Sequence, residues 1–157
     1  MRLWHKDLIG ALPRLQLMSQ WSECCCISKH IAENGSPNHI LVNKIMNYDL
    51  KHFYTYGLFV CMELIHRGYK CDSRKFDQYF IGGELVKVFS ELFNEHNNEW
   101  HNERYLDQCY YNLQEKFDCG GMSIEEWETF EKKYYEVKEK YSILNKEMES
   151  WWINARA

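Results

Sequence analysis

Residues 12–27, LPRLQLMSQWSECCCI, are the stretch around which the rest of the chain is organised. Apolar and sulfur-containing side chains recur in it at helical spacing, and Pro13 suits the first turn of a helix. The stretch therefore predicts one amphipathic helix. Its predicted buried face carries Leu17, Met18, Trp21, Cys24 and Cys25.

The opposite stripe of this helix holds a single carboxylate among uncharged polar neighbours. Gln16, Ser19, Gln20 and Glu23 share that stripe, and no Lys or Arg stands one turn from Glu23. Composition alone predicts a solvated glutamate on a surface helix. The alternative is a carboxylate that projects into a cleft, where no neighbouring charge neutralises it.

The chain has 157 residues, which suits one domain with a real core. Its 45% hydrophobic and 16% aromatic content indicates a globular protein, and two Pro and eight Gly argue against a turn-rich all-β fold. We expect an all-α, single-domain helical bundle with an N-terminal extended arm and a long C-terminal amphipathic helix. Residues 1–75 would form its core and residues 76–157 additional helices.

No run of apolar residues approaches the length of a membrane span, and MRLWHKDLIG at the start lacks the features of a signal peptide. We therefore expect a cytoplasmic protein without a membrane partner. The seven Cys at irregular spacing predict reduced thiols. Cys24, Cys25 and Cys26 point about 100° apart on a helix, so they cannot converge on one metal. We expect no metal and no cofactor, and Cys26 as the exposed thiol.

Charge is distributed unevenly, although a net charge of −4 does not by itself indicate a nucleic-acid-binding protein. Residues 1–75 hold ten Lys and Arg against six Asp and Glu, whereas residues 76–157 hold nine against seventeen. The first segment also holds five of the seven His. A phosphate-facing surface there is one explanation, and a charge asymmetry without any ligand is the other.

The N-terminal residues 2–11 are predicted to lie as an extended arm across the core, anchored by Leu3, Trp4 and Leu8. The first helix can run on to about Glu33, because residues 34–37, NGSP, are a stop and turn signal. Residues 38–46 suit a strand-like or a helical connector.

A second helix is predicted from Asn47 or Asp49, either of which can cap it, to Arg67, with Gly68 at the C′ position. Gly57 inside this helix favours the close approach of another helix or of the arm. Its predicted apolar stripe is Leu50, Phe53, Tyr54, Gly57, Leu58, Cys61, Leu64 and Ile65.

The second half of the chain also predicts helices. Short segments over 73–80 and 84–94 precede a loop or frayed helix over 95–102 and a helix over 105–117. A capping box at 123–126, SIEE, begins a long helix that either lies across the bundle or joins two chains in a dimer. Its seam is Trp127, Phe130, Tyr134, Val137, Tyr141, Leu144, Met148 and Trp151.

Two sequence blocks carry a resemblance to a known family. The first is Met1-Arg2-Leu3-Trp4, Leu12 and residues 16–23, QLMSQWSE; the second runs from residues 47–53 to residues 61–69, CMELIHRGY. Their order and spacing resemble the pyrimidine dimer DNA glycosylases of the phage endonuclease V type and their bacterial relatives. The family patterns are H-L-x-x-E-[YWH]-R-E in the first helix and E-x-x-x-R-G-[FY] at the end of the second. The resemblance covers roughly the first half of the chain.

The resemblance implies a DNA glycosylase with AP lyase activity, in which an N-terminal amine attacks C1′ of the damaged nucleotide and forms a Schiff base. An α-amine has an ordinary pKa near roughly 7.7–8, against about 10.4 for lysine, which suits a nucleophile at neutral pH. Glu23 would assist ring opening and then β-elimination of the 3′ phosphate. Removal of the initiator Met usually requires a small second residue, and here Arg2 follows Met1. The amine would therefore be that of Met1, one residue further out than in the phage enzymes, or that of Arg2 if Met1 is removed.

The chain departs from the family pattern at positions expected to contact DNA. Gln16 stands where the family has His, and Ser22 and Cys26 stand where it has Arg. We expect the double-stranded DNA to be contacted by Arg2, Arg14, Gln16, Lys29, His30 and, through the likeness of Trp151-Trp152 to the family's aromatic C-terminal segment, Trp152. The alternative function is a non-catalytic helical module that binds DNA or a protein on the same scaffold. We expect a monomer, with a dimer through the C-terminal helix as the alternative.

Overall fold

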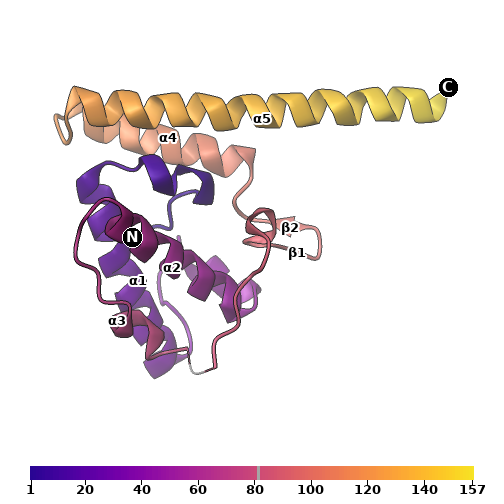
Figure 1. The fold of residues 1–157 in the computed structure, drawn as a ribbon. Helices are drawn as coiled ribbons and strands as arrows, with labels where there is room; N and C mark the ends of the chain where they lie inside the picture. The colour runs from indigo at the N-terminus through magenta and orange to yellow at the C-terminus, as the bar shows by residue number, and fades with distance from the viewer. Residues whose placement is uncertain (81) are drawn as a thin grey trace. The chain divides into compact units, whose positions relative to one another are not determined.

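The computed structural model describes residues 1–80 and 82–157, which divide into two compact units, Met1–His101 and Asn102–Ala157. Helices make up most of each unit (Figure 1). The predicted all-α class is confirmed, since the described residues add only one short hairpin to the helices. Within those residues, no helix has both the length and the apolar character that a membrane crossing requires.

Two helices, α1 (Arg14–Asn34) and α2 (Leu50–His66), pack against each other in the first unit (Figure 1). Helix α1 runs past residue 27 as predicted and ends at Gly35, which has a φ of 81° that favours glycine. Helix α2 begins at Asp49, whose carboxylate accepts the Lys51 N–H at 2.9 Å. Gly68 follows α2 with a φ of 87°, as its predicted C′ position requires.

The buried face of α1 differs from the predicted one. Leu17 and Cys24 are buried as expected, but Met18 is 41% exposed and Trp21 and Cys25 are half-buried. Gln16 and Gln20, which were assigned to the polar stripe, are buried instead. For Gln20 the prediction was wrong because the N-terminal segment supplies hydrogen-bond partners that hydrophobic periodicity does not reveal. Gln16 Oε1 is buried without such a partner among the described residues.

Helix α2 shows the same kind of difference. Phe53, Gly57 and Leu64 are buried as predicted, whereas Leu50 and Ile65 at the two ends of the predicted stripe are exposed. Its buried face also includes His52, Thr55, Tyr56 and Val60. The polar atoms among these bond to other segments, which makes their burial possible.

The N-terminal segment is not fully extended, which corrects the predicted arm. A 3₁₀ helix, η1 (Lys6–Ala11), follows the extended first residues, while Leu3, Trp4 and Leu8 are buried as predicted. Lys6 is 6% exposed, and its Nζ donates to the carbonyls of Ser90 at 3.1 Å and Leu92 at 2.9 Å. Burial lowers the pKa of this ammonium group.

The connector after α1 contains the 3₁₀ helix η2 (Asn43–Asn47), and α3 (Arg74–Asp77) follows α2. The Phe76 ring of α3 lies directly over Gly57, so the close approach predicted at this glycine is confirmed.

The predicted helix over 84–94 is wrong. That segment is irregular apart from the 3₁₀ helix η3 (Phe89–Glu91), because Lys6 and Thr55 bond its backbone groups. The predicted loop or frayed helix that follows is a hairpin of β1 (Asn94–Glu95) and β2 (Asn98–Glu99). His96 and Asn97 turn between the strands with φ of 51° and 62°.

The second unit pairs α4 (Glu103–Asp118) with α5 (Ile124–Arg156) (Figure 1). The Ser123 capping box is confirmed. Trp127, Phe130, Tyr134 and Val137 are buried, but the continuation of the seam at Leu144, Met148 and Trp151 is exposed. The seam is buried over its first half only, since α4 has 16 residues and α5 has 33.

Candidate active site

The carboxylate of Glu23 meets the backbone nitrogen of the second residue. Glu23 is half-buried on α1, and its Oε2 accepts a hydrogen bond from the Arg2 N–H at 3.1 Å. Met1 beyond this nitrogen is 44% exposed. The fold therefore brings the start of the chain to the one carboxylate that the sequence singled out on α1.

Two buried polar side chains hold the residues next to this contact. Gln20 Oε1 accepts the Trp4 N–H at 2.8 Å, and Gln20 Nε2 donates to the Arg2 carbonyl at 3.0 Å. The Tyr56 hydroxyl from α2 lies 2.7 Å from the Trp4 carbonyl and 3.0 Å from Gln20 Oε1, either of which can accept its proton. Residues 2–4 are thus bonded to both long helices of the unit.

The rest of the segment is fixed by a buried pair of histidines. His5 Nε2 donates to the His101 carbonyl at 2.9 Å, and His101 Nδ1 accepts the Lys6 N–H at 2.8 Å. Burial, together with the nearby His5 and Lys6, holds the pKa of His101 well below its ordinary value. His101 is therefore a neutral acceptor at physiological pH.

An arginine anchors the far end of the segment. The Arg67 guanidinium donates to the Leu12 carbonyl at 2.7 Å and to the Gly10 carbonyl at 3.1 Å, and it also bonds Glu63 at 2.7 Å. Glu63, Arg67 and Gly68 are the E-x-x-x-R-G signature of the second sequence block. In this structure Arg67 of the signature positions the N-terminal segment.

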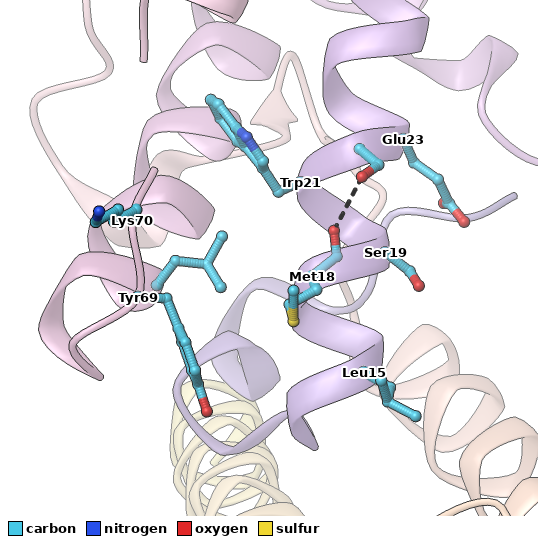
Figure 2. Close-up of a pocket in the computed structure, with 9 residues that line it drawn as sticks. Leu15, Met18, Ser19, Trp21, Glu23, Tyr69 and Lys70 are labelled. Carbon is cyan, nitrogen blue, oxygen red and sulfur yellow. Dashed lines mark hydrogen bonds between the residues drawn. The ribbon is translucent and has the colours of Figure 1, made fainter. Parts of the chain in front are cut away.

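Beside Glu23 lies a hollow of about 510 Å³ between α1 and the residues that follow α2. Figure 2 shows Met18 and Trp21 on one side of α1, facing Tyr69 and Lys70, and Ser19 and Glu23 on the other side. Its lining is completed by Leu15, Ser22 and Leu64. An aromatic and apolar wall with one ammonium group suits the flat face and negative backbone of a nucleotide.

The residues predicted to contact DNA lie in different surroundings. The Arg2 guanidinium lies over the Trp4 ring at 5.7 Å, and the Arg14 guanidinium lies over the Tyr69 ring at 5.5 Å. Lys29 and His30 are exposed on α1, roughly 10 Å along the helix from Glu23. The structure brings together Arg2 and Glu23 and leaves Lys29 and His30 further along the same helix.

Gln16 and Trp152 complete the predicted set. Gln16 is only 9% exposed, and within residues 1–80 and 82–157 its Oε1 has no hydrogen-bond partner. Trp152 is 53% exposed on α5, with the Arg156 guanidinium 5.5 Å from its ring centroid. Trp152 belongs to the second unit, whereas Gln16 and Glu23 belong to the first.

The cysteines of α1 show no sign of a shared ligand. Cys24 is buried, Cys25 is half-buried and Cys26 is exposed, as predicted for Cys26. Burial raises the pKa of Cys25 to about 11, which keeps this thiol protonated at neutral pH. The described part of the chain contains no group of three His, Cys, Asp or Glu side chains that could hold a metal ion.

Four further residues of the site are not predicted by the sequence: Gln20, Tyr56, Tyr69 and Lys70. Gln20 stands three residues before Glu23, so both project from neighbouring positions of one helix face. That spacing was the available signal for Gln20. For Tyr56 the local sequence held no signal, because its partners are 36 and 52 residues away.

A comparison with known protein families matches residues 1–77 to the family model described as pyrimidine dimer DNA glycosylase. The match includes both sequence blocks, so the resemblance of the N-terminal half is confirmed. The match supports a DNA repair glycosylase in general. No curated protein and no solved structure matches the chain.

Proposed function

We propose that this chain is a DNA glycosylase with AP lyase activity that acts on damaged duplex DNA, with a pyrimidine dimer as the lesion that the matched family names. The observation that carries the proposal is the 3.1 Å contact between the Arg2 nitrogen and Glu23 Oε2. The Arg2 nitrogen is one residue from the α-amine of Met1 and would itself be the α-amine after removal of Met1, so the contact puts a carboxylate near the amine in either form.

The proposed reaction follows from these two groups. The amine attacks C1′ of the damaged nucleotide, the bond from C1′ to the base breaks, and opening of the sugar ring gives a Schiff base. Glu23 takes up the proton that the attacking nitrogen loses, donates it to the ring oxygen as the ring opens and, as a carboxylate again, takes a proton from C2′. The departing base keeps the electron pair of its bond to C1′ and is protonated by solvent. The bond from C3′ to the phosphate oxygen breaks, and hydrolysis of the imine releases the amine and an unsaturated aldehyde.

The nucleophile is the α-amine of Met1 or, after removal of Met1, that of Arg2. In the second case the nitrogen already lies against Glu23. In the first case the amine stands one residue further out, and the exposed Met1 has to turn back toward the carboxylate. The mass of the intact protein separates these two forms.

DNA binding would use charges of the N-terminal segment and around the hollow. Arg2 and Arg14 each present a guanidinium next to an aromatic ring, and Lys70 stands at the rim of the hollow beside Glu23. DNA contacts remain predictions from the sequence for Lys29, His30, Gln16 and Trp152. The cytoplasmic location also remains a prediction. A phosphate contact by any of these residues contributes to affinity for every DNA sequence alike.

The test is borohydride trapping of the tag-free protein on duplex DNA that carries an abasic site. The wild type is expected to form a covalent complex whose cross-linked peptide contains the N-terminal residue. Glu23→Gln should slow trapping by roughly 10²-fold or more, whereas Glu33→Gln, a change of the same kind at an exposed position of α1, should not.

A protein that binds this DNA but forms no covalent complex would refute the lyase and support the alternative, a non-catalytic DNA-binding module. A protein that neither binds this DNA nor reacts with it would support a protein-binding module instead. Incubation with dimer-containing duplex then tests the lesion, because a dimer-specific enzyme releases one end of the dimer from its sugar and leaves undamaged duplex intact.

A further inference from the structure

We infer that Gln20 is a positioning residue that fixes the register of the N-terminal segment, so that the nitrogen of residue 2 faces Glu23. This inference rests on the proposed function, because the register matters for the reaction only if that nitrogen or its neighbour reacts. Gln20 is not among the residues that the sequence assigned to the site.

The geometry of the Gln20 amide specifies a register and does not simply fill space. Its Nε2 donates to the carbonyl of residue 2 and its Oε1 accepts the N–H of residue 4. In a parallel β-sheet, one residue likewise bonds the carbonyl and the N–H of two residues that flank a single residue of the next strand. A slip of the segment by one residue would present groups that point the other way, and both bonds would be lost.

The burial of Gln20 makes the loss of either hydrogen bond unfavourable. Gln20 is 0% exposed, so water cannot replace a lost partner. A buried polar group without a hydrogen bond is unfavourable, so every register that leaves the amide unpaired is disfavoured. The Tyr56 hydroxyl, 2.7 Å from the Trp4 carbonyl, adds a third bond to the same three residues.

Helix α1 links this clamp rigidly to the carboxylate. Gln20 and Glu23 stand three residues apart, so their Cβ atoms are about 5–6 Å from each other whatever the rest of the chain does. The distance from the Arg2 nitrogen to Glu23 Oε2 is therefore set by the amide that binds the Arg2 carbonyl. Displacement of a reacting group by about 1 Å can cost roughly 10²-fold in rate.

The experiment measures single-turnover borohydride trapping by full-length protein on abasic-site duplex, and separately the Kd for duplex with a reduced abasic site that cannot react. Gln20→Met keeps the length of the side chain and removes both hydrogen bonds. We expect trapping to slow by roughly 10²-fold while Kd stays within about twofold. Tyr56→Phe should slow trapping in the same direction by a smaller factor.

The control is Ser28→Ala, which removes a buried hydrogen bond elsewhere on α1, from Ser28 Oγ to the Cys25 carbonyl at 2.9 Å. It should leave the trapping rate unchanged. Equal slowing by Ser28→Ala and Gln20→Met would overturn the inference, since general destabilisation would then explain both. Trapping by Gln20→Met within about threefold of wild type would also overturn it.

Gln20→Glu provides a second variant, whose side chain keeps the shape of glutamine and needs no refilling of the core. Its ionised carboxylate accepts from Trp4 but cannot donate to Arg2, whereas the protonated acid can do both. We therefore expect the deficit in trapping relative to wild type to shrink as the pH is lowered. A deficit that does not change with pH would contradict the bond to Arg2.

Failure of the inference is distinguishable from failure of the proposed function. Wild-type protein that traps no DNA refutes the proposed function, and this role of Gln20 falls with it. Wild-type protein that traps DNA beside a Gln20→Met variant that traps equally fast refutes the role of Gln20 alone.

Discussion

Replacement of Arg67 by methionine should destabilise the Met1–His101 unit more than any other single loss of charge at its surface. Arg67 closes α2 and donates to two carbonyls of the N-terminal segment, those of Gly10 and Leu12. Methionine keeps most of the apolar stem but has no donor. Both carbonyls then lose their protein partner, and the segment loses its anchor at this end.

The size of the effect follows from the number of bonds and their exposure. Hydrogen bonds to a charged group contribute roughly 1.5–3 kcal/mol each when they are shielded from water. The Arg67 side chain is 24% exposed, so water replaces part of what is lost, and its ion pair with Glu63 adds only about 0.2–1 kcal/mol. We expect the free energy of unfolding to fall by about 2–3 kcal/mol. For a chain of this length that corresponds to roughly 5–10 °C in Tm.

The assay is urea unfolding followed by tryptophan fluorescence, with thermal unfolding as a second measurement. Arg74→Met is the matched control, because Arg74 is 89% exposed and pairs only locally with Asp72 at 2.9 Å. It should not change stability measurably. Arg67→Lys keeps the charge but cannot reach both carbonyls at once, so its stability should lie between those of wild type and Arg67→Met. Equal stabilities of Arg67→Met and Arg74→Met would refute the anchoring role.

Two further perturbations test the packing and the protonation state of the same unit. Gly57→Ala places a methyl group against the Phe76 ring and should cost about 1–3 kcal/mol in urea unfolding, while Gly10→Ala, where an added Cβ meets nothing within 4 Å, should cost far less. Equal costs would contradict the close approach of α3. The pKa of His101 in the folded chain lies well below its ordinary value of 6.5. Below about pH 6.5 the unfolded chain therefore binds a proton at His101 that the folded chain does not bind, and the free energy of unfolding should fall as the pH is lowered. His101→Gln should flatten that dependence, and His66→Gln, at an exposed position, should not.

The sequence predicted the parts of the fold that depend on local signals. The bounds of α1 and α2 follow from a turn at 34–37, a cap at Asp49 and a glycine at 68, each of which acts within a few residues. The capping box at Ser123 belongs to the same class. Glu23 could be singled out because it is the one carboxylate on its helix stripe and because the N-terminal half resembles a known family.

What the sequence could not predict depends on hydrogen bonds between distant segments. Periodicity predicted that Gln20 lies on a polar stripe, since a glutamine in water and a glutamine bonded to a buried backbone are identical in sequence. The predicted helix over 84–94 failed for the same reason. Lys6, more than 80 residues away, binds the carbonyls of Ser90 and Leu92 and gives that segment partners outside a helix.

These long-range hydrogen bonds all involve the N-terminal segment. The first unit therefore holds that segment in a fixed position. Gln20 and Tyr56 bind residues 2–4, His101 binds residues 5 and 6, and Arg67 binds residues 10 and 12. Core packing alone would require only the apolar side chains of the segment. Leu3, Trp4 and Leu8 are buried and meet that requirement. Polar partners at residues 2–6, 10 and 12 add a fixed register instead. A fixed register is what a nitrogen 3.1 Å from a carboxylate needs if it is to react, so variants that weaken these bonds should impair trapping before they impair DNA affinity.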